Sequence, residues 1–326
     1  MRSVVSVDGV ITDADRAVVP VLDRGFLYGD SVYEVFWWHR GVLIQAADHF
    51  ARLRASAQRI YMEVPGPDAR YADAIRRAVE ASGCPPDGDA YVRLVVTRGI
   101  TSIGLKLDGA RNGAVVVVVQ DAHRPTPAEW ARGLRVALVN RLRVSADALD
   151  PAAKTGNYMN NLLALHEARQ RGADDAVLLN DRARVTEAST ANVYRVYRGV
   201  LETPPLAAGI LRGTTRTRIL ALCARQGQIA HERDLVASDL RDADEVFLSS
   251  SVRGVIPVVA VDDAPVGRGV PGPVTTQVRA WFEAEADAEA DVARGTRGPA
   301  AVAPNAAPDV VPNVVPNAVP NGGRTA

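Results

Sequence analysis

The stretch PAAKTGNYMNN, residues 151–161, contains one of only two lysines in a chain of 326 residues. The second lysine is Lys106, and the 36 other basic residues are arginines. A lysine amine can lose its proton, whereas a guanidinium keeps its charge. We therefore interpret Lys154 as a residue with a chemical role. The pattern predicts that Lys154 ends a strand and that a helix over residues 157–171, carrying Tyr158, follows it.

The composition around this stretch is that of a globular protein large enough for two domains, with 47% hydrophobic and 23% charged residues. Thirty-eight acidic residues balance 38 basic ones, so no electrostatic basis exists for binding nucleic acid or an anionic membrane. No apolar run approaches the ~20 residues that a membrane helix needs. Asp8 comes too early for a signal peptide, and Cys84 and Cys223 lack CxxC spacing. We expect a cytoplasmic protein without a disulfide.

Residues 1–122 are predicted to form a small α+β domain. Alternating apolar residues around the turn pairs Asp8-Gly9 and Arg40-Gly41 predict two hairpins. The five consecutive valines at 115–119 predict a strand that is buried on both faces. The predicted strands are 4–7, 10–12, 32–38, 42–45, 91–96 and 115–119, and the predicted helices are 46–62 and 68–82.

The Pro-rich segment 123–133 predicts a linker, and residues 134–285 predict a larger second domain. From residue 286 the composition changes, and a proline recurs every four residues between Pro304 and Pro320. Because such a segment cannot sustain a helix or a sheet, we expect a disordered Pro/Ala-rich tail over residues 286–326. The second domain's predicted strands are 134–139, 176–179, 192–197, 245–248 and 255–261, and its helices are 157–171, 214–225 and 273–285.

Several features away from Lys154 indicate groups that can bind an anion and a carboxylate that can take part in catalysis. Tyr91 and Arg93 share one face of a strand, which is either solvated or lines an anion-binding cavity. Glu187 closes a short strand and is either a turn carboxylate or a catalytic one. The Gly-Thr-Thr sequence at 213–215 begins a helix whose free N–H groups can bind phosphate, and three serines at 249–251 follow a strand. The histidines and cysteines show no metal-ligand spacing.

This inventory matches pyridoxal 5'-phosphate better than a nucleotide. Lys154 can form an imine, a carboxylate can keep the pyridine nitrogen protonated, and amides and hydroxyls can hold the phosphate. The chain also resembles the class IV pyridoxal-phosphate aminotransferases over residues 3–285. That family comprises branched-chain and D-amino-acid aminotransferases, R-selective amine transaminases and aminodeoxychorismate lyases. The motifs that carry the resemblance are LDRGFLYGDSVYEVF (22–36), HFARLRASAQRI (49–60), YVRLVVTRG (91–99), KTGNYMNNLLALHEARQRGADDAVLL (154–179), VTEASTANVY (185–194), GILRGTTR (209–216) and DEVFLSSSVRGVIPV (244–258).

The resemblance implies a two-domain fold of type IV, α+β, with a small α/β domain, a larger β-barrel-like domain and the cofactor in the cleft between them. Lys154 would be the catalytic Schiff-base lysine and proton carrier. The helical pattern places Arg52 opposite the apolar face, which suggests solvent, whereas the resemblance implies that it binds the phosphate; both hold if that side of the helix faces the cleft between the domains. The implied cofactor-binding residues are Arg52, Lys154, Tyr158 at the phenolic oxygen, Glu187 at the pyridine nitrogen, Leu211 on the ring, and Thr214, Thr215 and Ser251 at the phosphate. The residues that would bind the substrate are Tyr28, Tyr33, Tyr91 and Arg93. The resemblance also implies a homodimer, in which Tyr28 would reach the partner's site.

The motifs point to different substrates within the family. DRGFLYGDSVYEV and VTEASTANVY resemble the D-amino-acid enzymes, whereas KTGNY and YVR resemble the branched-chain enzymes. Ile103 and Leu105 replace the Arg-x-His pair that traps the carboxylate in the D-amino-acid enzymes, and Arg253 is either a substitute trap or part of a surface ion pair. We expect an aminotransferase that leans to D-amino acids. The alternatives are a branched-chain L-amino-acid aminotransferase, an aminodeoxychorismate-lyase-like enzyme and a binding protein without activity.

Overall fold

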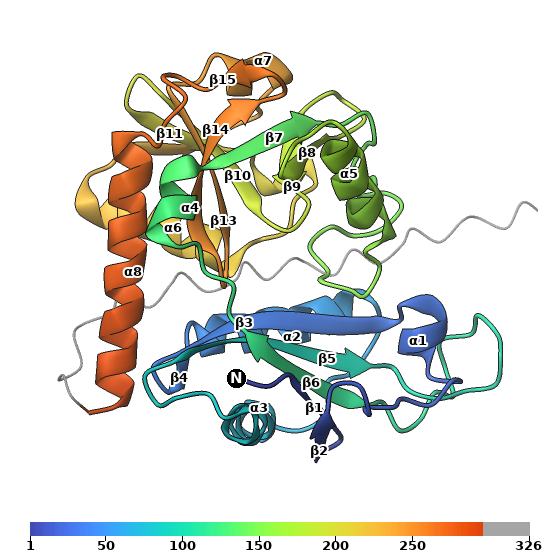
Figure 1. Cartoon of the computed structure of the whole chain (residues 1–326). Coiled ribbons are helices and arrows are strands. Elements are labelled where there is room, and N and C mark those ends of the chain that lie inside the picture. The colour runs from blue at the N-terminus through green and yellow to red at the C-terminus, as the bar shows by residue number, and fades with distance from the viewer. Residues whose placement is uncertain (296–326) are drawn as a thin grey trace, which may run out of the picture.

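The computed structural model describes residues 1–295 and builds them around two sheets, which lie one above the other in Figure 1. The lower sheet comes from residues before 122, and the upper sheet comes from residues after 133. The arrangement confirms the predicted two-part α+β fold. Most predicted elements are present, with ends that differ by a few residues.

The small sheet is antiparallel throughout, in the order β2-β1-β6-β5-β3-β4. Apolar faces of two helices, with Leu53 and Ile75 at their centres, pack on one face of this sheet and form its core. A five-residue helix, α1, precedes β3. The elements are β1 Val4–Val7, β2 Val10–Asp13, α1 Arg24–Tyr28, β3 Ser31–His39, β4 Val42–Leu43, α2 Ala46–Arg59, α3 Asp68–Ser82, β5 Asp89–Thr97 and β6 Val115–Asp121.

The prediction that the valine run is buried on both faces is wrong. In β6 the odd-numbered valines are buried, whereas Val116 and Val118 are only half-buried. The reason is that only one face of the sheet packs on α2 and α3, whereas the other turns toward the second domain, where Tyr33 and Arg93 line a cavity.

The large domain contains a closed ring of strands in the order β10-β13-β14-β7-β8-β9, with β9 pairing back to β10. The ring closes at the pair Asn192 and Glu187, so the predicted barrel-like domain is confirmed. Three further strands extend the sheet outside the ring. The strands are β7 Leu134–Leu138, β8 Asp175–Leu179, β9 Val185–Ala188, β10 Asn192–Tyr197, β11 Val200–Thr203, β12 Ala230–Glu232, β13 Glu245–Ser250, β14 Gly254–Val261 and β15 Ala264–Pro265.

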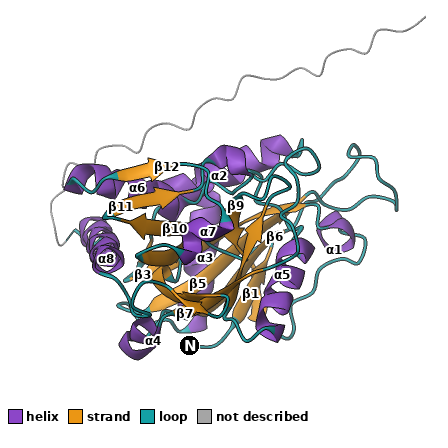
Figure 2. Ribbon diagram, turned by 90° about the horizontal axis from the view of Figure 1, so that it is seen from above, coloured by secondary structure: helices purple, strands orange, loops and turns teal. Residues whose placement is uncertain are grey.

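Helices surround this barrel (Figure 2). Ala164 and Ala168 pack one helix on β7 and β8, whereas Ile219 and Phe282 pack two others beside β10 and β13. None of the helices in the described residues has the length and apolar character required to cross a bilayer. The helices are α4 Pro127–Arg132, α5 Met159–Gln170, a 3-10 turn Leu206–Ala208, α6 Thr214–Gln226, α7 Ala237–Arg241 and α8 Pro273–Ala293.

Two segments differ from the predicted organisation. The segment predicted as a linker contains α4, which begins with a capping box between Thr126 and Glu129. Helix α8 runs to residue 293, so the prediction that a disordered tail begins at 286 is wrong over residues 286–293. Ala286 and Ala290 lie on the same face and are fully buried, which extends the helix. The rest of the predicted tail, from residue 296, lies outside the described residues.

Candidate active site

A cavity of about 590 Å³ lies between the two sheets. Its wall includes twelve of the thirteen residues that sequence analysis assigned to the site, and the small and large domains both contribute. Tyr28 is the exception: its ring is half-buried near Arg24, whose guanidinium carbon lies 5.2 Å from the ring centre. The twelve are Tyr33, Arg52, Tyr91, Arg93, Lys154, Tyr158, Glu187, Leu211, Thr214, Thr215, Ser251 and Arg253.

Lys154 does not end a strand, contrary to the prediction. It lies in a loop before α5 that is hydrogen-bonded to the small domain: the Tyr33 N–H donates to the Lys154 carbonyl at 3.1 Å, and the Lys154 N–H donates to Ser56 Oγ at 3.0 Å. The Gly156 N–H donates to the Ser31 carbonyl at 3.0 Å. A side chain at Gly156 would come within 2.6 Å of Ser31 Oγ, so glycine allows this close approach. The loop thus holds the lysine backbone against β3.

The Lys154 amine points to two tyrosine hydroxyls. Its Nζ lies 3.2 Å from Tyr33 Oη and 3.4 Å from Tyr158 Oη. Burial raises the pKa of Tyr33. Burial alone would also raise the pKa of Tyr158, but the Lys154 ammonium and the hydrogen bond from Tyr33 outweigh it and lower that pKa. Tyr158 is therefore the hydroxyl of the pair that gives up its proton more readily.

Glu187 lies in β9 at the ring closure and is buried, with 6% of its surface exposed. Arg143 Nη2 donates to its Oε1 at 2.9 Å, and the Leu211 N–H donates to its Oε2 at 3.1 Å. Burial raises the pKa of Glu187, and the Arg143 guanidinium opposes that rise. Sequence analysis missed Arg143, because it lies in a segment without periodicity or motif and nothing in the sequence shows its pairing across 44 positions.

Arg52 is a cation that the small domain contributes to the wall. Its side chain is only 11% exposed and lines the cavity, so the polar side of the helix faces the space between the domains and not open solvent. Its Nε and Nη2 donate to Glu34 at 2.7 and 2.6 Å, and its Nη1 donates to the Arg212 carbonyl at 3.0 Å. Two contacts to one carboxylate hold the planar guanidinium in one orientation. The cation on the polar side of α2 therefore faces the space between the domains.

His49 completes this cluster. Its Nδ1 lies 2.7 Å from Glu34 Oε2 and its Nε2 lies 3.3 Å from Thr214 Oγ1. Burial lowers the pKa of His49, so the neutral ring donates from Nδ1 and accepts the Thr214 hydroxyl at Nε2. Sequence analysis missed Glu34 and His49, although a signal existed. Glu34 shares a strand face with Val32 and Phe36, and a carboxylate on an apolar face indicates a buried partner.

The residues around the start of α6 fit a phosphate. The Thr215 hydroxyl is buried without a hydrogen-bond partner among the described residues, and the N–H groups of the first turn have no carbonyl before them in the helix. At Gly213 a Cβ would lie 2.0 Å from Asn192 Oδ1, so the backbone here is close-packed. With Arg52 on the wall of the same cavity, these groups could hold an anion.

Arg253 lies on the wall beside Ser251, in the turn between β13 and β14. Its Nη2 donates to Thr190 Oγ1 at 3.1 Å and lies 3.5 Å from the buried carboxylate of Asp175. Arg93 lies on the small-domain wall, with its guanidinium carbon 3.9 Å from the centre of the Tyr33 ring. Its face of β5 therefore lines a cavity, and anion binding by that face stays a prediction.

Comparisons with known proteins show the family to which this chain belongs. The family model described as amino-transferase class IV matches residues 31–261. The chain belongs to the class IV aminotransferases. A D-alanine aminotransferase of Bacillus licheniformis is 30% identical over 272 residues, which cover 83% of this chain and 93% of that protein. The predicted enzyme class is therefore confirmed.

Two solved structures of branched-chain aminotransferases show the same fold. The enzyme of Thermoproteus uzoniensis, solved with norvaline, has a TM-score of 0.79 and 30% identity, covering 87% of this chain and 94% of that one. The enzyme of Thermobaculum terrenum, solved in its PLP form, has a TM-score of 0.77 and 24% identity, covering 87% and 94%. The predicted cofactor, pyridoxal 5'-phosphate, is the one this family uses, and solved structures similar to this chain include both PLP and pyridoxamine 5'-phosphate forms.

Proposed function

We propose that this class IV aminotransferase moves an amino group between an α-amino acid and a 2-oxo acid, with a lean to D-amino acids. The observation that carries the proposal is the place of Lys154 Nζ, 3.2 Å from Tyr33 Oη and 3.4 Å from Tyr158 Oη, in a cavity that also holds an anion site and a buried carboxylate. An amine among two hydroxyls can take and return a proton without leaving the cavity.

When bound, pyridoxal 5'-phosphate supplies an aldehyde that condenses with amines and a ring that withdraws electrons from the substrate's α-carbon. Lys154 Nζ would take the proton from that carbon and return it. Glu187, held by Arg143 and the Leu211 N–H, would accept a hydrogen bond from the ring nitrogen, and Tyr158 would face the phenolic oxygen. Arg52, Thr214, Thr215 and Ser251 would hold the phosphate, and Leu211 would pack on the ring.

The lean to D-amino acids rests on how the substrate carboxylate would be bound. Ile103 and Leu105, which replace the Arg-x-His pair, are 78% and 82% exposed and are not part of the cavity wall. Arg253 stands on that wall, where its Nη2 donates to Thr190 Oγ1 and lies 3.5 Å from the Asp175 carboxylate, and its other nitrogens would bind the substrate carboxylate. A second candidate is a branched-chain L-amino-acid aminotransferase, which is favoured by Tyr91 and Arg93 on the opposite wall.

The donor comparison tests this proposal. D-alanine and L-leucine are incubated separately with 2-oxoglutarate and the purified holoenzyme, and the new amino acid and 2-oxo acid are quantified. We expect turnover with D-alanine, and none from Lys154→Ala or Lys154→Arg, since neither side chain can accept the α-proton near neutral pH. Turnover with L-leucine alone would select the branched-chain alternative. Product from neither donor would overturn transamination of α-amino acids.

The same assay tests Arg253. Arg253→Ala should raise the KM for 2-oxoglutarate about tenfold, the value of one charge-assisted hydrogen bond. Arg182→Ala removes an exposed arginine away from the cavity and serves as the control. An unchanged KM would place the carboxylate elsewhere.

We also propose that the enzyme is a homodimer. Phe26 is 65% exposed, and the loop with Ile103 and Leu105 lies beside it, because Arg24 in the same helix donates to the Gly104 carbonyl at 3.0 Å. Exposed apolar side chains on neighbouring segments are typical of an interface. Tyr28 follows Phe26 in α1 and would then reach the partner's cavity. A particle mass of one chain in sedimentation at micromolar concentration would contradict this.

A further inference from the structure

The turn between β13 and β14 carries two of the proposed site residues. The two strands pair as far as Ser250 and Gly254, and Ser251, Val252 and Arg253 connect them. All three line the cavity. Gly254 has a φ of +66°, and a side chain there would meet the Phe282 ring at 3.4 Å. The place of this turn therefore decides where Ser251 Oγ and the Arg253 guanidinium lie.

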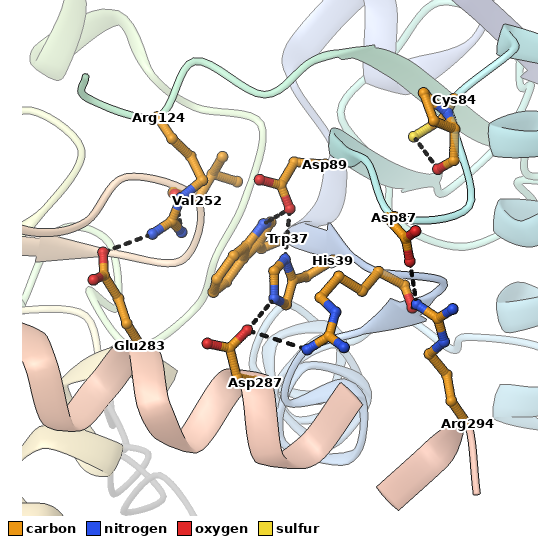
Figure 3. A network of polar contacts seen from close by, with 12 residues as sticks. Trp37, His39, Cys84, Asp87, Asp89, Arg124, Val252, Glu283, Asp287 and Arg294 are labelled. Carbon is orange, nitrogen blue, oxygen red and sulfur yellow. Dashed lines mark hydrogen bonds and ion pairs between the residues drawn. The ribbon is translucent and has the colours of Figure 1, made fainter. Parts of the chain in front are cut away.

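Arg124 contacts this turn at Val252 (Figure 3). It comes from the segment between the domains, and 19% of its side chain is exposed. Its Nη1 donates to the Val252 carbonyl at 3.2 Å, and its Nη2 donates to Glu283 Oε1 in α8 at 3.1 Å. Its guanidinium carbon lies 3.9 Å from the centre of the Trp37 ring in β3. One side chain thus contacts the small sheet, α8 and the cavity turn.

The indole on which Arg124 stacks is itself fixed. Trp37 Nε1 donates to Asp89 Oδ1 at 2.9 Å, and the His39 ring lies 4.4 Å from the Trp37 ring, centre to centre. His39 Nδ1 is 2.6 Å from Asp89 Oδ1, and Nε2 is 2.9 Å from Asp287 Oδ1 in α8. With a carboxylate oxygen at each ring nitrogen, His39 bridges β5 and α8 (Figure 3).

We propose that Arg124 is a positioning residue that sets the place of the Ser251–Arg253 turn and, through it, the affinity for the cofactor phosphate and for the substrate carboxylate. The inference rests on the proposed roles of Ser251 and Arg253. The planar guanidinium stacks on Trp37 while two separate nitrogens donate to Val252 and to Glu283. A lysine at 124 would keep the charge, but its single nitrogen would have to reach both acceptors.

Arg124→Ala and Arg124→Lys test this, with Arg279→Ala as the matched control. Arg279 donates to the same Glu283 Oε1, at 2.9 Å, but belongs to α8 and makes no contact with Val252. The Kd for pyridoxal 5'-phosphate is measured by absorbance titration of the apoprotein, and kcat and KM for 2-oxoglutarate are measured at saturating cofactor. We expect both Arg124 variants to raise Kd and KM about tenfold, with kcat changed much less. Arg279→Ala should change them less than twofold.

A double-mutant cycle shows whether Arg124 acts through the turn. If it does, Arg124→Lys should change the KM much less in the Arg253→Ala background than in the wild type, and the cofactor Kd much less in the Ser251→Ala background. The inference would be overturned if Arg124→Lys had the same effects in the wild type and in the Arg253→Ala and Ser251→Ala backgrounds. It would also be overturned if the Arg124 variants lowered the melting temperature but left Kd and KM unchanged. If Arg253→Ala leaves KM unchanged, the proposed carboxylate site fails instead, and the Ser251 cycle still decides the role of Arg124.

Discussion

Replacing Glu34 by Gln should destabilise the protein strongly while leaving its shape almost unchanged. Glu34 is fully buried and accepts hydrogen bonds from Arg52 Nε and Nη2 and from His49 Nδ1, all within 2.7 Å. Burial alone would raise its pKa, but Arg52 and His49 lower it from 4.5 to about 2. That difference corresponds to about 3 kcal/mol in favour of the charged carboxylate.

The magnitude follows from two sources that agree. Removing one partner of a buried ion pair costs about 3–5 kcal/mol, because the remaining charge is left without compensation. A glutamine also turns an N–H₂ group toward a cluster that already consists of donors. We therefore expect Glu34→Gln to lower the free energy of unfolding by about 3 kcal/mol at pH 7. Because Arg52 would lose its orientation, the Kd for pyridoxal 5'-phosphate should rise as well.

The pH dependence has a definite sign. The pKa of Glu34 is lower in the folded chain than in the unfolded one, so its contribution is fully present above pH 4.5 and is lost as the pH falls toward 2. Urea unfolding followed by circular dichroism between pH 7.5 and pH 3.5 measures this. The free energies of unfolding of the wild type and the variant should differ by a constant amount down to about pH 5. Below that pH the two free energies should converge.

The control is Glu80→Gln, which removes an exposed ion pair with Arg76. Exposed pairs contribute about 0–1 kcal/mol, so this variant should unfold almost like the wild type. The reasoning would be refuted if Glu34→Gln and Glu80→Gln lowered the free energy of unfolding equally. It would also be refuted if the difference between the wild type and Glu34→Gln became larger at acidic pH.

Two further variants test the packing at α6 and the contact between domains. Gly213→Ala would place a Cβ 2.0 Å from Asn192 Oδ1, so we expect a melting temperature lower by several degrees, corresponding to about 1–3 kcal/mol, and a raised cofactor Kd; normal values would show that Asn192 can move away freely. Burial alone would lower the pKa of His39, but its hydrogen bonds to Asp89 and Asp287 raise it. The contribution of His39 to stability is therefore complete below the pKa that it has in the unfolded chain, and it is lost as the pH rises through the higher pKa of the folded chain. We therefore expect His39→Gln to destabilise the protein more at pH 6 than at pH 9. A larger effect at pH 9 would contradict this assignment.

The elements with strong periodicity were predictable, and those without it were not. The helix over 68–82 matches α3 at both ends, because its apolar face has a regular spacing and a glycine stops it. The valine run shows only that a strand exists, since valine suits both faces equally. Helix α8 was predicted too short because EAEADAEAD reads as a solvated charge run. Its acidic residues instead pair with distant arginines, such as Arg40 with Asp291.

Some residues of the candidate site could likewise be predicted from the sequence, and others could not. Residues on recognisable motifs, such as Lys154 and Glu187, could be predicted because imine chemistry and a charged ring require an amine and a carboxylate. Arg143 could not, because it meets Glu187 only when the barrel closes. Arg52 shows an intermediate case. Helical periodicity places it correctly on the polar side of α2, but that side lies in the cleft, and no single-helix pattern contains the position of a second domain.

The position of the reactive amine depends on how the two domains are held together. The backbone of Lys154 is hydrogen-bonded to Tyr33 in the small domain, whereas Glu187 and the α6 start belong to the large one. A small rotation between the sheets would therefore move the amine relative to the groups that we propose hold the cofactor, and near-attack geometry tolerates little error. The interdomain contacts made by Arg124 and His39 oppose such a rotation. Charged residues between the domains would thereby hold Lys154, one of only two lysines in the chain, at a fixed place in the cavity.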